Sequence, residues 1–188
     1  MFLCCRNDYN VNKLVILDRD GVINYDSPAY IKSPEEWIEI PGSMEAIALL
    51  NAKNFKVAIA TNQSGIGRGY YNQATLDAIH NKLITSLQNA NGKIDKLAIC
   101  PHLPTDNCLC RKPKPGMFQE ILSFFNIDPQ QDTVYAVGDS ARDIEAAVAA
   151  NCQPILVRTG NGNATIEKLS ALASVPIFDN LLAFAKSL

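Results

Sequence analysis

The chain has 188 residues, of which 47% are hydrophobic and 19% charged, a composition typical of a folded globular protein and not of a disordered one. Its 17 basic and 19 acidic residues give a net charge of -2, so no basic surplus indicates a nucleic acid or an anionic membrane as a partner. No apolar run is long enough to span a bilayer, and the first twelve residues lack the pattern of a secretory signal. We therefore expect a cytoplasmic protein, with residues 1–12 as a disordered or frayed leader and 13–188 as one domain.

Short, β-branched apolar runs alternate along the chain with longer segments of helical period. The predicted strands are 14–17, 57–60, 97–99, 133–137, 154–157 and 175–178. The predicted helices are 43–52, 73–89, 115–125, 141–150, 165–173 and 180–187. Strands that alternate with helices predict an α/β fold, a three-layer doubly wound parallel sheet covered on both faces. We expect the strand order to reverse beside Asp18. No segment is long enough for a separate cap domain, and 24–40 is expected to form only a flap.

Ligands of such sheets bind beyond the carboxyl ends of the strands, and two carboxylates follow the first strand. Asp18 and Asp20 stand two positions apart in extended chain, so their side chains can project the same way. Mg²⁺ prefers oxygen ligands and also binds substrate phosphate. One carboxylate can instead be a nucleophile in phosphoryl transfer, and the other a general acid and base. The alternative is that the D-x-D-G sequence is merely a turn that ends a strand.

The second strand ends in polar residues that can bind an anion. Thr61, Asn62, Gln63 and Ser64 offer a hydroxyl, amides and free backbone N–H groups, which together can form an anion cradle. An ordinary polar turn is the alternative. The glycines at 65, 67 and 69 form no dinucleotide-binding fingerprint, because they do not follow the first strand and no helix is expected to open within them.

The later strand ends supply cations and further acids. Arg111 and Lys112 follow the third strand, where a fixed lysine can neutralise charge on a transferring phosphoryl group and an arginine can recognise a second anion. Asp139 follows the fourth strand and can complete a set of carboxylates for a metal ion. Asp143 lies near the start of a helix, where the helix dipole favours an acid, so we expect it to have a structural or supporting role.

In order and spacing, DRDGV, TNQSG, RKPKPG and GDSARD resemble the four motifs of the haloacid dehalogenase-like (HAD) phosphatase superfamily. The resemblance covers nearly the whole chain from residue 13 onward, and it implies a HAD-like Rossmannoid fold. It also implies that Asp18 is the nucleophile and Asp20 the general acid and base. Mg²⁺ would be held by Asp18, Asp139 and the backbone carbonyl of Asp20. Thr61 and Lys112 would stabilise the transferring phosphoryl group.

A cysteine–histidine loop occupies residues 100–110. Cys100, His102, Cys108 and Cys110 are a full tetrahedral set for structural Zn²⁺. The loop has too few apolar residues to hold itself, and closure by a metal would fix the arginine and lysine that follow it. The alternative, that these cysteines are small buried hydrophobes, fits poorly with the polar residues between them. His80 and Cys152 have no ligand-like neighbours and are expected to be structural.

With this loop, the resemblance narrows to the D,D-heptose 1,7-bisphosphate phosphatase family. The chain reads DRDGVIN, TNQSGIGRG, CPH…CLCRKPKPGM and VGDSARD where that family has DRDGVIN, TNQSGIxRG, CPH…CxCRKPxPGM and VGD…D. The resemblance implies a monomeric hydrolase that removes the C7 phosphate of a seven-carbon sugar bisphosphate, on the way to nucleotide-activated heptose for lipopolysaccharide or related glycans. The substrate-binding residues are then expected to be Asp26, Asn62, Gln63, Ser64, Arg111 and Ser140.

Three other functions remain open from the sequence. Histidinol-phosphate phosphatases resemble the chain in all four motifs and in the zinc loop, although Arg111 favours a second anion over a cationic amine. A non-enzymatic phospho-acceptor, similar to a response-regulator receiver, also uses an aspartate and Mg²⁺ but lacks a hydrolytic partner such as Asp20. A zinc-dependent interaction module with a vestigial acid cluster is the third alternative.

Overall fold

The computed structural model describes residues 12–168 and 174–188. All of the predicted leader except Asn12 lies outside these described residues, as does the end of the helix predicted at 165–173. None of the helices in the two described ranges is long and apolar enough to cross a membrane.

Six parallel strands form one sheet in the order β3-β2-β1-β4-β5-β6. Their bounds are β1 Lys13–Leu17, β2 Lys56–Asn62, β3 Lys96–Cys100, β4 Thr133–Gly138, β5 Gln153–Val157 and β6 Ile177–Phe178. The chain builds outward from β1 in one direction and then, from β4 on, in the other. The reversal therefore falls beside Asp18, which directly follows β1, as predicted.

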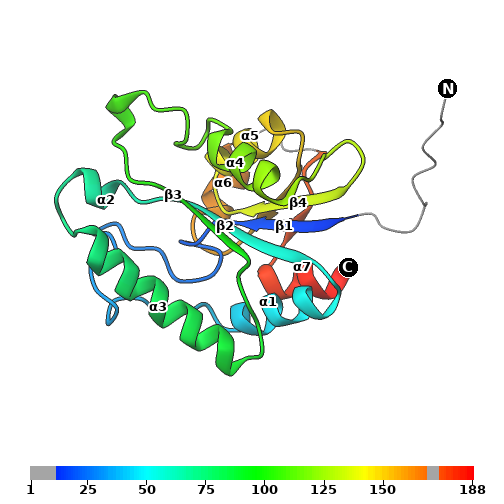
Figure 1. Cartoon of the computed structure of the whole chain (residues 1–188), viewed down its shortest axis with the longest axis horizontal. Coiled ribbons are helices and arrows are strands. Elements are labelled where there is room, and N and C mark those ends of the chain that lie inside the picture. Colours follow the sequence, from blue (N-terminus) through cyan, green and yellow to red (C-terminus); the bar gives the residue numbers. More distant parts are fainter. Residues whose placement is uncertain (1–11, 169–173) are drawn as a thin grey trace.

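Helices cover both faces of the sheet, with α1, α3 and α7 on one side and α4, α5 and α6 on the other (Figure 1). Their bounds are α1 Ser43–Ala52, α2 Ser64–Gly67, α3 Gln73–Asn89, α4 Gly116–Phe125, α5 Ala141–Ala149, α6 Gly162–Lys168 and α7 Leu181–Ser187, with a 3₁₀ turn at Pro104–Asp106. The predicted three-layer, doubly wound α/β fold is confirmed.

Alternate residues of β1 belong to different hydrophobic cores. Val15 and Leu17 pack into the core beneath α1, α3 and α7, whereas Leu14 and Ile16 pack into the core beneath α4 and α5. All four are almost completely buried. A strand that is buried on both faces needs apolar residues at every position, which explains the uninterrupted run LVIL. This central strand fixes the position of the carboxylates that follow it.

Two helix predictions are wrong. A short helix, α2, does open within the glycine run at Ser64–Gly67, and its four residues are too few to carry a helical period. Gly65 of this helix packs against the ring of Tyr71, where a side chain would not fit. The helix predicted from 165 begins at Gly162, because its first turn is polar and small and carries no apolar signal.

The flap, residues 24–40, contains no regular helix or strand, only isolated bridges from Asn24 to Asp20 and to Glu39. Its Trp37 is buried in the core. Lys82 on α3 donates hydrogen bonds to the carbonyls of Pro34 and Trp37, at 2.6 and 2.8 Å. The flap is therefore held against α3 at two adjacent points.

Candidate active site

The carboxyl ends of β1 and β4 and the start of α5 bring three acids around one lysine. Lys112 Nζ lies 2.9 Å from Asp18 Oδ1 and 2.6 Å from Asp143 Oδ1. Asp18, Asp139 and Asp143 each present an oxygen, and these oxygens all lie within 4.8 Å of one another. Lys112 is 2% exposed, so its charge acts on this cluster with little screening by solvent.

The electrostatics of the cluster suit a divalent cation. Burial and the neighbouring carboxylates raise the pKa of Asp18 well above its ordinary value, and burial raises the pKa of Asp139 to about 6. Burial alone would lower the pKa of Lys112, yet Asp143 and Asp18 raise it above its ordinary value. Crowded carboxylates of this kind are stabilised as anions by a hard cation with oxygen ligands, so Asp18 and Asp139 fit Mg²⁺.

Asp139 is placed by two tight turns. Its Oδ2 accepts hydrogen bonds from the backbone N and the side-chain Nδ2 of Asn161, at 2.7 and 3.1 Å. Gly21 and Gly160, with φ of +82° and +57°, lie next to each other beside the Asp139 carboxylate. A Cβ on either glycine would overlap the Asp139 carboxylate, and both backbone conformations are ones that side chains rarely adopt. The two glycines thus let Asp139 approach the segment that follows β1.

Asp20 is held by three side chains from different parts of the chain. Arg19 donates from Nε and Nη2 at 2.9 to 3.1 Å, and Asn24 and Gln63 each donate from an amide at 2.9 Å. Burial would raise the pKa of Asp20, but the Arg19 charge and these hydrogen bonds hold it below its ordinary value. The carboxylate is therefore ionised in the resting protein and has a fixed orientation.

The predicted anion cradle is only partly open to the pocket. Thr61 is 1% exposed, and its Oγ1 accepts a hydrogen bond from Gln63 Nε2 at 2.8 Å. Asn62 exchanges hydrogen bonds with the backbone of Lys112, at 3.1 and 3.2 Å, so it positions the lysine. Asn62, Gln63 and Ser64 line the pocket, whereas Thr61 does not lie among its lining residues.

One pocket of about 240 Å³ contains most of the predicted site. The predicted residues that line it are Asp18, Asp20, Asp26, Asn62, Gln63, Ser64, Arg111, Lys112, Asp139 and Ser140. Arg68, Arg142 and Asn161 also line it and were not predicted. The first two stand inside the quoted motifs TNQSGIGRG and GDSARD, which was the available signal. Arg68, Arg111 and Arg142, together with Arg19, thus line the same pocket as the cluster of acids.

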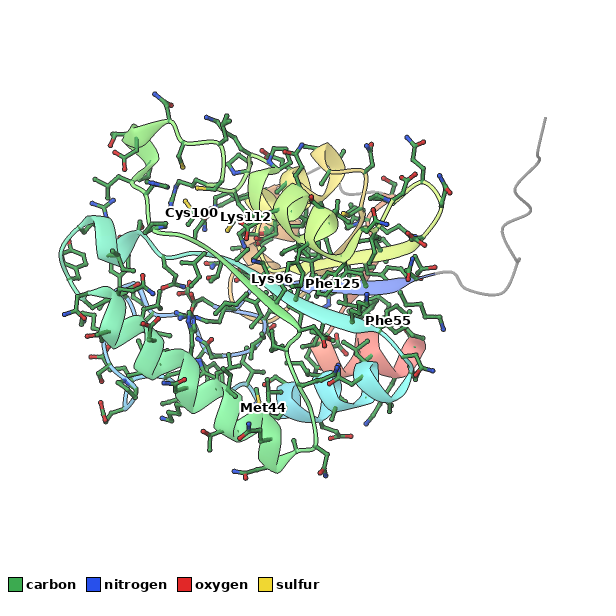
Figure 2. All side chains as sticks on the ribbon, viewed as in Figure 1. Met44, Phe55, Lys96, Cys100, Lys112 and Phe125 are labelled. Carbon is green, nitrogen blue, oxygen red and sulfur yellow. The ribbon has the colours of Figure 1, made fainter. Side chains whose placement is uncertain are left out.

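The cysteine–histidine loop brings its four side chains together. Cys100 Sγ lies 3.7 Å from Cys108 Sγ and 3.6 Å from His102 Nδ1, and Cys110 Sγ lies 3.5 Å from Cys108 Sγ and 3.2 Å from His102 Nδ1. Zn–S bonds of about 2.3 Å in a tetrahedron imply ligand separations of about 3.8 Å, so the set fits zinc. Figure 2 places Cys100 at the same end of the sheet as Lys112.

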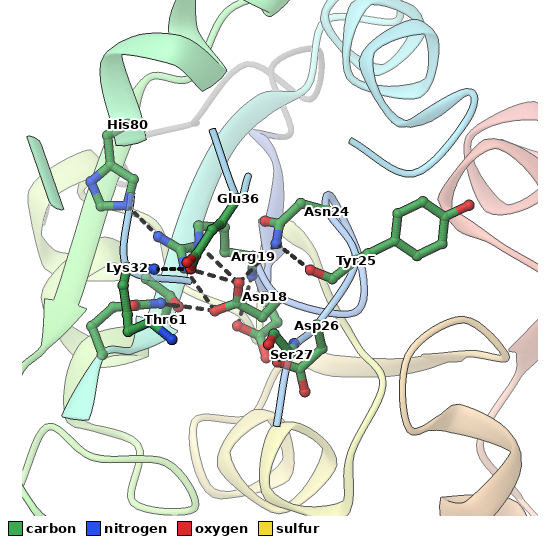
Figure 3. Close-up of polar contacts among 12 residues, drawn as sticks. Asp18, Arg19, Asn24, Tyr25, Asp26, Ser27, Lys32, Glu36, Thr61 and His80 are labelled. Atoms are coloured by element: carbon green, nitrogen blue, oxygen red, sulfur yellow. Dashed lines mark hydrogen bonds and ion pairs between the residues drawn. The ribbon is translucent and has the colours of Figure 1, made fainter. Parts of the chain in front are cut away.

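Arg19 and His80 lie inside the site but were not predicted from the sequence as functional. Arg19 is 1% exposed and lies between Asp20 and His80, with its Nη1 at 3.2 Å from His80 Nε2 (Figure 3). His80 was predicted to be structural and without ligand-like neighbours. Asp143, predicted to be structural or supporting, contacts Lys112 directly. Its Oδ2 also accepts from the hydroxyl and the backbone N–H of Ser140, at 2.5 and 3.1 Å.

The fold and the site together define a phosphatase of the HAD class. A carboxylate beside a metal-binding acid cluster, a fixed lysine and a separately held second carboxylate are the groups needed for phosphoryl transfer to an aspartate and for its hydrolysis. The HAD-hydrolase-like family model matches residues 109–184.

More similar relatives narrow the class. The D-glycero-β-D-manno-heptose-1,7-bisphosphate 7-phosphatase of Pseudomonas putida is 52% identical over 176 residues, which cover 94% of this chain and 99% of the relative. The crystal structure of the Bordetella bronchiseptica D,D-heptose 1,7-bisphosphate phosphatase, complexed with magnesium and phosphate, is 47% identical, with a TM-score of 0.89 over 93% of this chain and 97% of that one. The chain belongs to the D-glycero-β-D-manno-heptose-1,7-bisphosphate 7-phosphatase family.

Membership of this family makes the chain an enzyme, a phosphoric monoester hydrolase. The relatives do not favour the histidinol-phosphate alternative, and a phospho-acceptor or a zinc-dependent interaction module does not fit a hydrolase family.

Proposed function

We propose that this enzyme removes the C7 phosphate of D-glycero-D-manno-heptose 1,7-bisphosphate in the biosynthesis of nucleotide-activated heptose, for lipopolysaccharide or a related glycan. One observation carries the proposal: a single pocket is lined both by the Asp18–Lys112 pair and by Arg68, Arg111 and Arg142. The pair can receive the phosphate that is cleaved, and the arginines can bind the phosphate that is kept.

In the first step, a carboxylate oxygen of Asp18 attacks the phosphorus, and the bond from phosphorus to the C7 oxygen breaks. The leaving oxygen takes a proton from Asp20, and an aspartyl-phosphate remains on Asp18. The phosphate anion of a bound substrate favours the protonated form of a nearby carboxylate, which offsets the effect of Arg19 on Asp20. Lys112 neutralises negative charge on the transferring phosphoryl group. Thr61 assists in stabilising this group through its hydrogen bond with the Gln63 amide.

In the second step, Asp20 takes a proton from water, and the resulting hydroxide oxygen bonds to phosphorus. The bond to Asp18 breaks, and inorganic phosphate leaves with Asp18 restored as a carboxylate. Mg²⁺ bound by Asp18, Asp139 and the Asp20 carbonyl would neutralise charge on the phosphoryl oxygens. Asp143 keeps Lys112 charged and in place throughout, because it lies 2.6 Å from the ammonium group.

The substrate assignment predicts a preference for bisphosphates that depends on Arg111. We expect faster phosphate release from heptose 1,7-bisphosphate than from histidinol phosphate. Arg111→Ala should lower kcat/KM for the bisphosphate by about 10- to 100-fold, which corresponds to the loss of one hydrogen bond between charged groups. The kcat/KM for heptose 7-phosphate should hardly change. The measurement is steady-state phosphate release with both anomers of the bisphosphate, heptose 7-phosphate and histidinol phosphate.

Lys114→Ala is the matched control, since Lys114 is an exposed cation of the same segment that does not line this pocket. It should leave all rates unchanged. A higher kcat/KM for histidinol phosphate than for either bisphosphate anomer would overturn the substrate assignment.

We also propose that Cys100, His102, Cys108 and Cys110 bind a structural Zn²⁺. Support comes from their separations of 3.2 to 3.7 Å and from the Arg111 guanidinium, which donates a hydrogen bond to the His102 carbonyl at 3.2 Å. A metal here would fix the backbone that presents Arg111 and Lys112 to the pocket.

Thiolates remain available only in a reducing compartment, so we propose a cytoplasmic enzyme.

Cys108→Ser should release zinc and lower activity by about tenfold or more, because the loop that carries Arg111 and Lys112 loses its cross-link. Metal content is measured by elemental analysis of protein purified without chelator, and activity by phosphate release. Cys152→Ala removes a buried thiol outside the cluster and should retain a full zinc content. If the unaltered protein carries no zinc, the structural-metal assignment is wrong.

A further inference from the structure

A buried polar chain connects Asp20 to the middle of α3. The Arg19 guanidinium contacts both Asp20 oxygens through Nε and Nη2, and its Nη1 lies 3.2 Å from His80 Nε2. Figure 3 shows Arg19 with His80 on one side and the carboxylates on the other. Arg19 is 1% and His80 5% exposed, so solvent cannot replace these contacts.

The direction of the hydrogen bond is fixed by chemistry. A guanidinium is always charged and only donates, so His80 Nε2 must accept, which requires a neutral imidazole with its proton on Nδ1. Burial and the Arg19 charge lower the pKa of His80 to about 4, in agreement with that state. His80 lies on the buried stripe of α3 with Leu76, Ile79 and Leu83, where an apolar residue is the ordinary choice. A polar group at this position needs a partner, and the partner is Arg19.

Asp20 also has a second support. Gln63 Nε2 donates to Asp20 Oδ2 at 2.9 Å, and Tyr71 OH donates to Gln63 Oε1 at 2.7 Å. The amide is thereby oriented with its NH₂ group toward the carboxylate. Asp20 is thus held by Arg19 backed by His80, by Gln63 backed by Tyr71, and by the Asn24 amide. Without His80, the Arg19 guanidinium would keep an unpaired buried donor and could turn away from Asp20 toward the phosphate pocket that it lines.

We propose that His80 is a positioning residue, which accepts a hydrogen bond from Arg19 and so holds the guanidinium against Asp20 in the orientation that proton transfer needs. The inference rests on the proposed acid and base role of Asp20. His80 does not touch the substrate. It acts through Arg19, and its loss should slow the proton-transfer steps without weakening substrate binding.

The test compares a substitution that keeps a hydrogen-bond acceptor with one that removes it. His80→Gln keeps an acceptor, and His80→Leu does not. We expect His80→Leu to lower kcat by about 10- to 100-fold with KM nearly unchanged, as for small misplacement of a catalytic group. His80→Gln should stay within about threefold of the unaltered enzyme. If His80→Leu does not fold, the unbranched His80→Met, whose thioether is a weak acceptor, replaces it.

A pre-steady-state measurement separates positioning from damage to the fold. The leaving group of p-nitrophenyl phosphate needs little protonation, so His80→Leu should show a full burst of nitrophenol. Slow turnover should follow, because hydrolysis of the aspartyl-phosphate is slowed. Leu83→Ala is the control, because Leu83 is a buried residue of the same helix whose apolar side chain cannot accept a hydrogen bond from Arg19. It should lower the melting temperature and leave the rate per folded molecule unchanged.

Three results would overturn the positioning role: normal turnover in His80→Leu, equal losses in the Gln and Leu variants, or a turnover that falls only in proportion to the loss of folded protein. Its failure is distinguishable from failure of the proposed mechanism. If Asp20→Asn turns over at a normal rate, the role of Asp20 is wrong and the inference falls with it. If Asp20→Asn is impaired while His80→Leu is normal, only the role of His80 is wrong.

Discussion

Asp18→Asn is expected to abolish phosphate release, with a loss on the order of 10⁴-fold or more, because an amide cannot replace the attacking carboxylate. The substitution is almost isosteric, and Lys112 keeps its ion pair with Asp143 at 2.6 Å, so the fold should be retained. The measurement is phosphate release with the heptose bisphosphate and with p-nitrophenyl phosphate, together with thermal unfolding.

The same variant makes a prediction about stability in chelator. The pKa of Asp18 is raised in the folded protein, chiefly by burial, so its ionised form opposes folding at neutral pH and this cost disappears as the carboxyl takes a proton at lower pH. Asp18→Asn removes the charge, and the melting temperature at pH 7 in chelator should equal or exceed that of the unaltered enzyme. Asp179→Asn, an exposed acid distant in sequence from every motif, should change neither rate nor stability. Activity of Asp18→Asn above about 1% would contradict a nucleophilic role.

Much of the fold follows from the sequence because the sheet is buried on both faces. The run LVIL is apolar at every position, and β4 and β5 are similar, so strands and their order along the chain can be predicted from local sequence. Once the strands are known, the rule that sites lie at carboxyl ends directs attention to Asp18, Lys112 and Asp139. Each of these residues follows a strand along the chain, and the structure brings them together as that rule implies.

The unpredicted parts of the site depend on contacts that no local pattern encodes. His80 stands 61 positions after Arg19, and only the packing of α3 against the segment after β1 brings them to 3.2 Å. On sequence alone His80 is one polar residue in an apolar stripe. Asp143 was noticed in the sequence, but its position at a helix start was enough to explain an acid there, because the helix dipole favours one. Its contact with Lys112 requires the third and fourth strand ends to face each other.

Asp20→Asn should separate the two chemical steps. An amide cannot give a proton to the leaving oxygen or take one from water, so kcat for the sugar phosphate should fall by about 10²- to 10⁴-fold. With p-nitrophenyl phosphate, phosphorylation of Asp18 should proceed while hydrolysis stalls. Rapid-quench measurement of nitrophenol and intact-protein mass spectrometry should therefore show a burst and an accumulated phosphoenzyme. The double variant Asp18→Asn/Asp20→Asn should form none, which assigns the phosphate to Asp18.

The loss of activity in Asp20→Asn can also be compared with the loss caused by changing the residues that hold Asp20. Arg19, Asn24 and Gln63 all donate to Asp20, and an amide at position 20 must turn one of its own donors toward one of theirs. The substitution thus removes the proton carrier and also disturbs its surroundings, whereas His80→Leu disturbs only the surroundings. Its loss should exceed that of His80→Leu, and both variants should accumulate the same phosphoenzyme. Steady-state rates of Asp20→Asn within about twofold of the unaltered enzyme would be incompatible with proton transfer by this carboxylate.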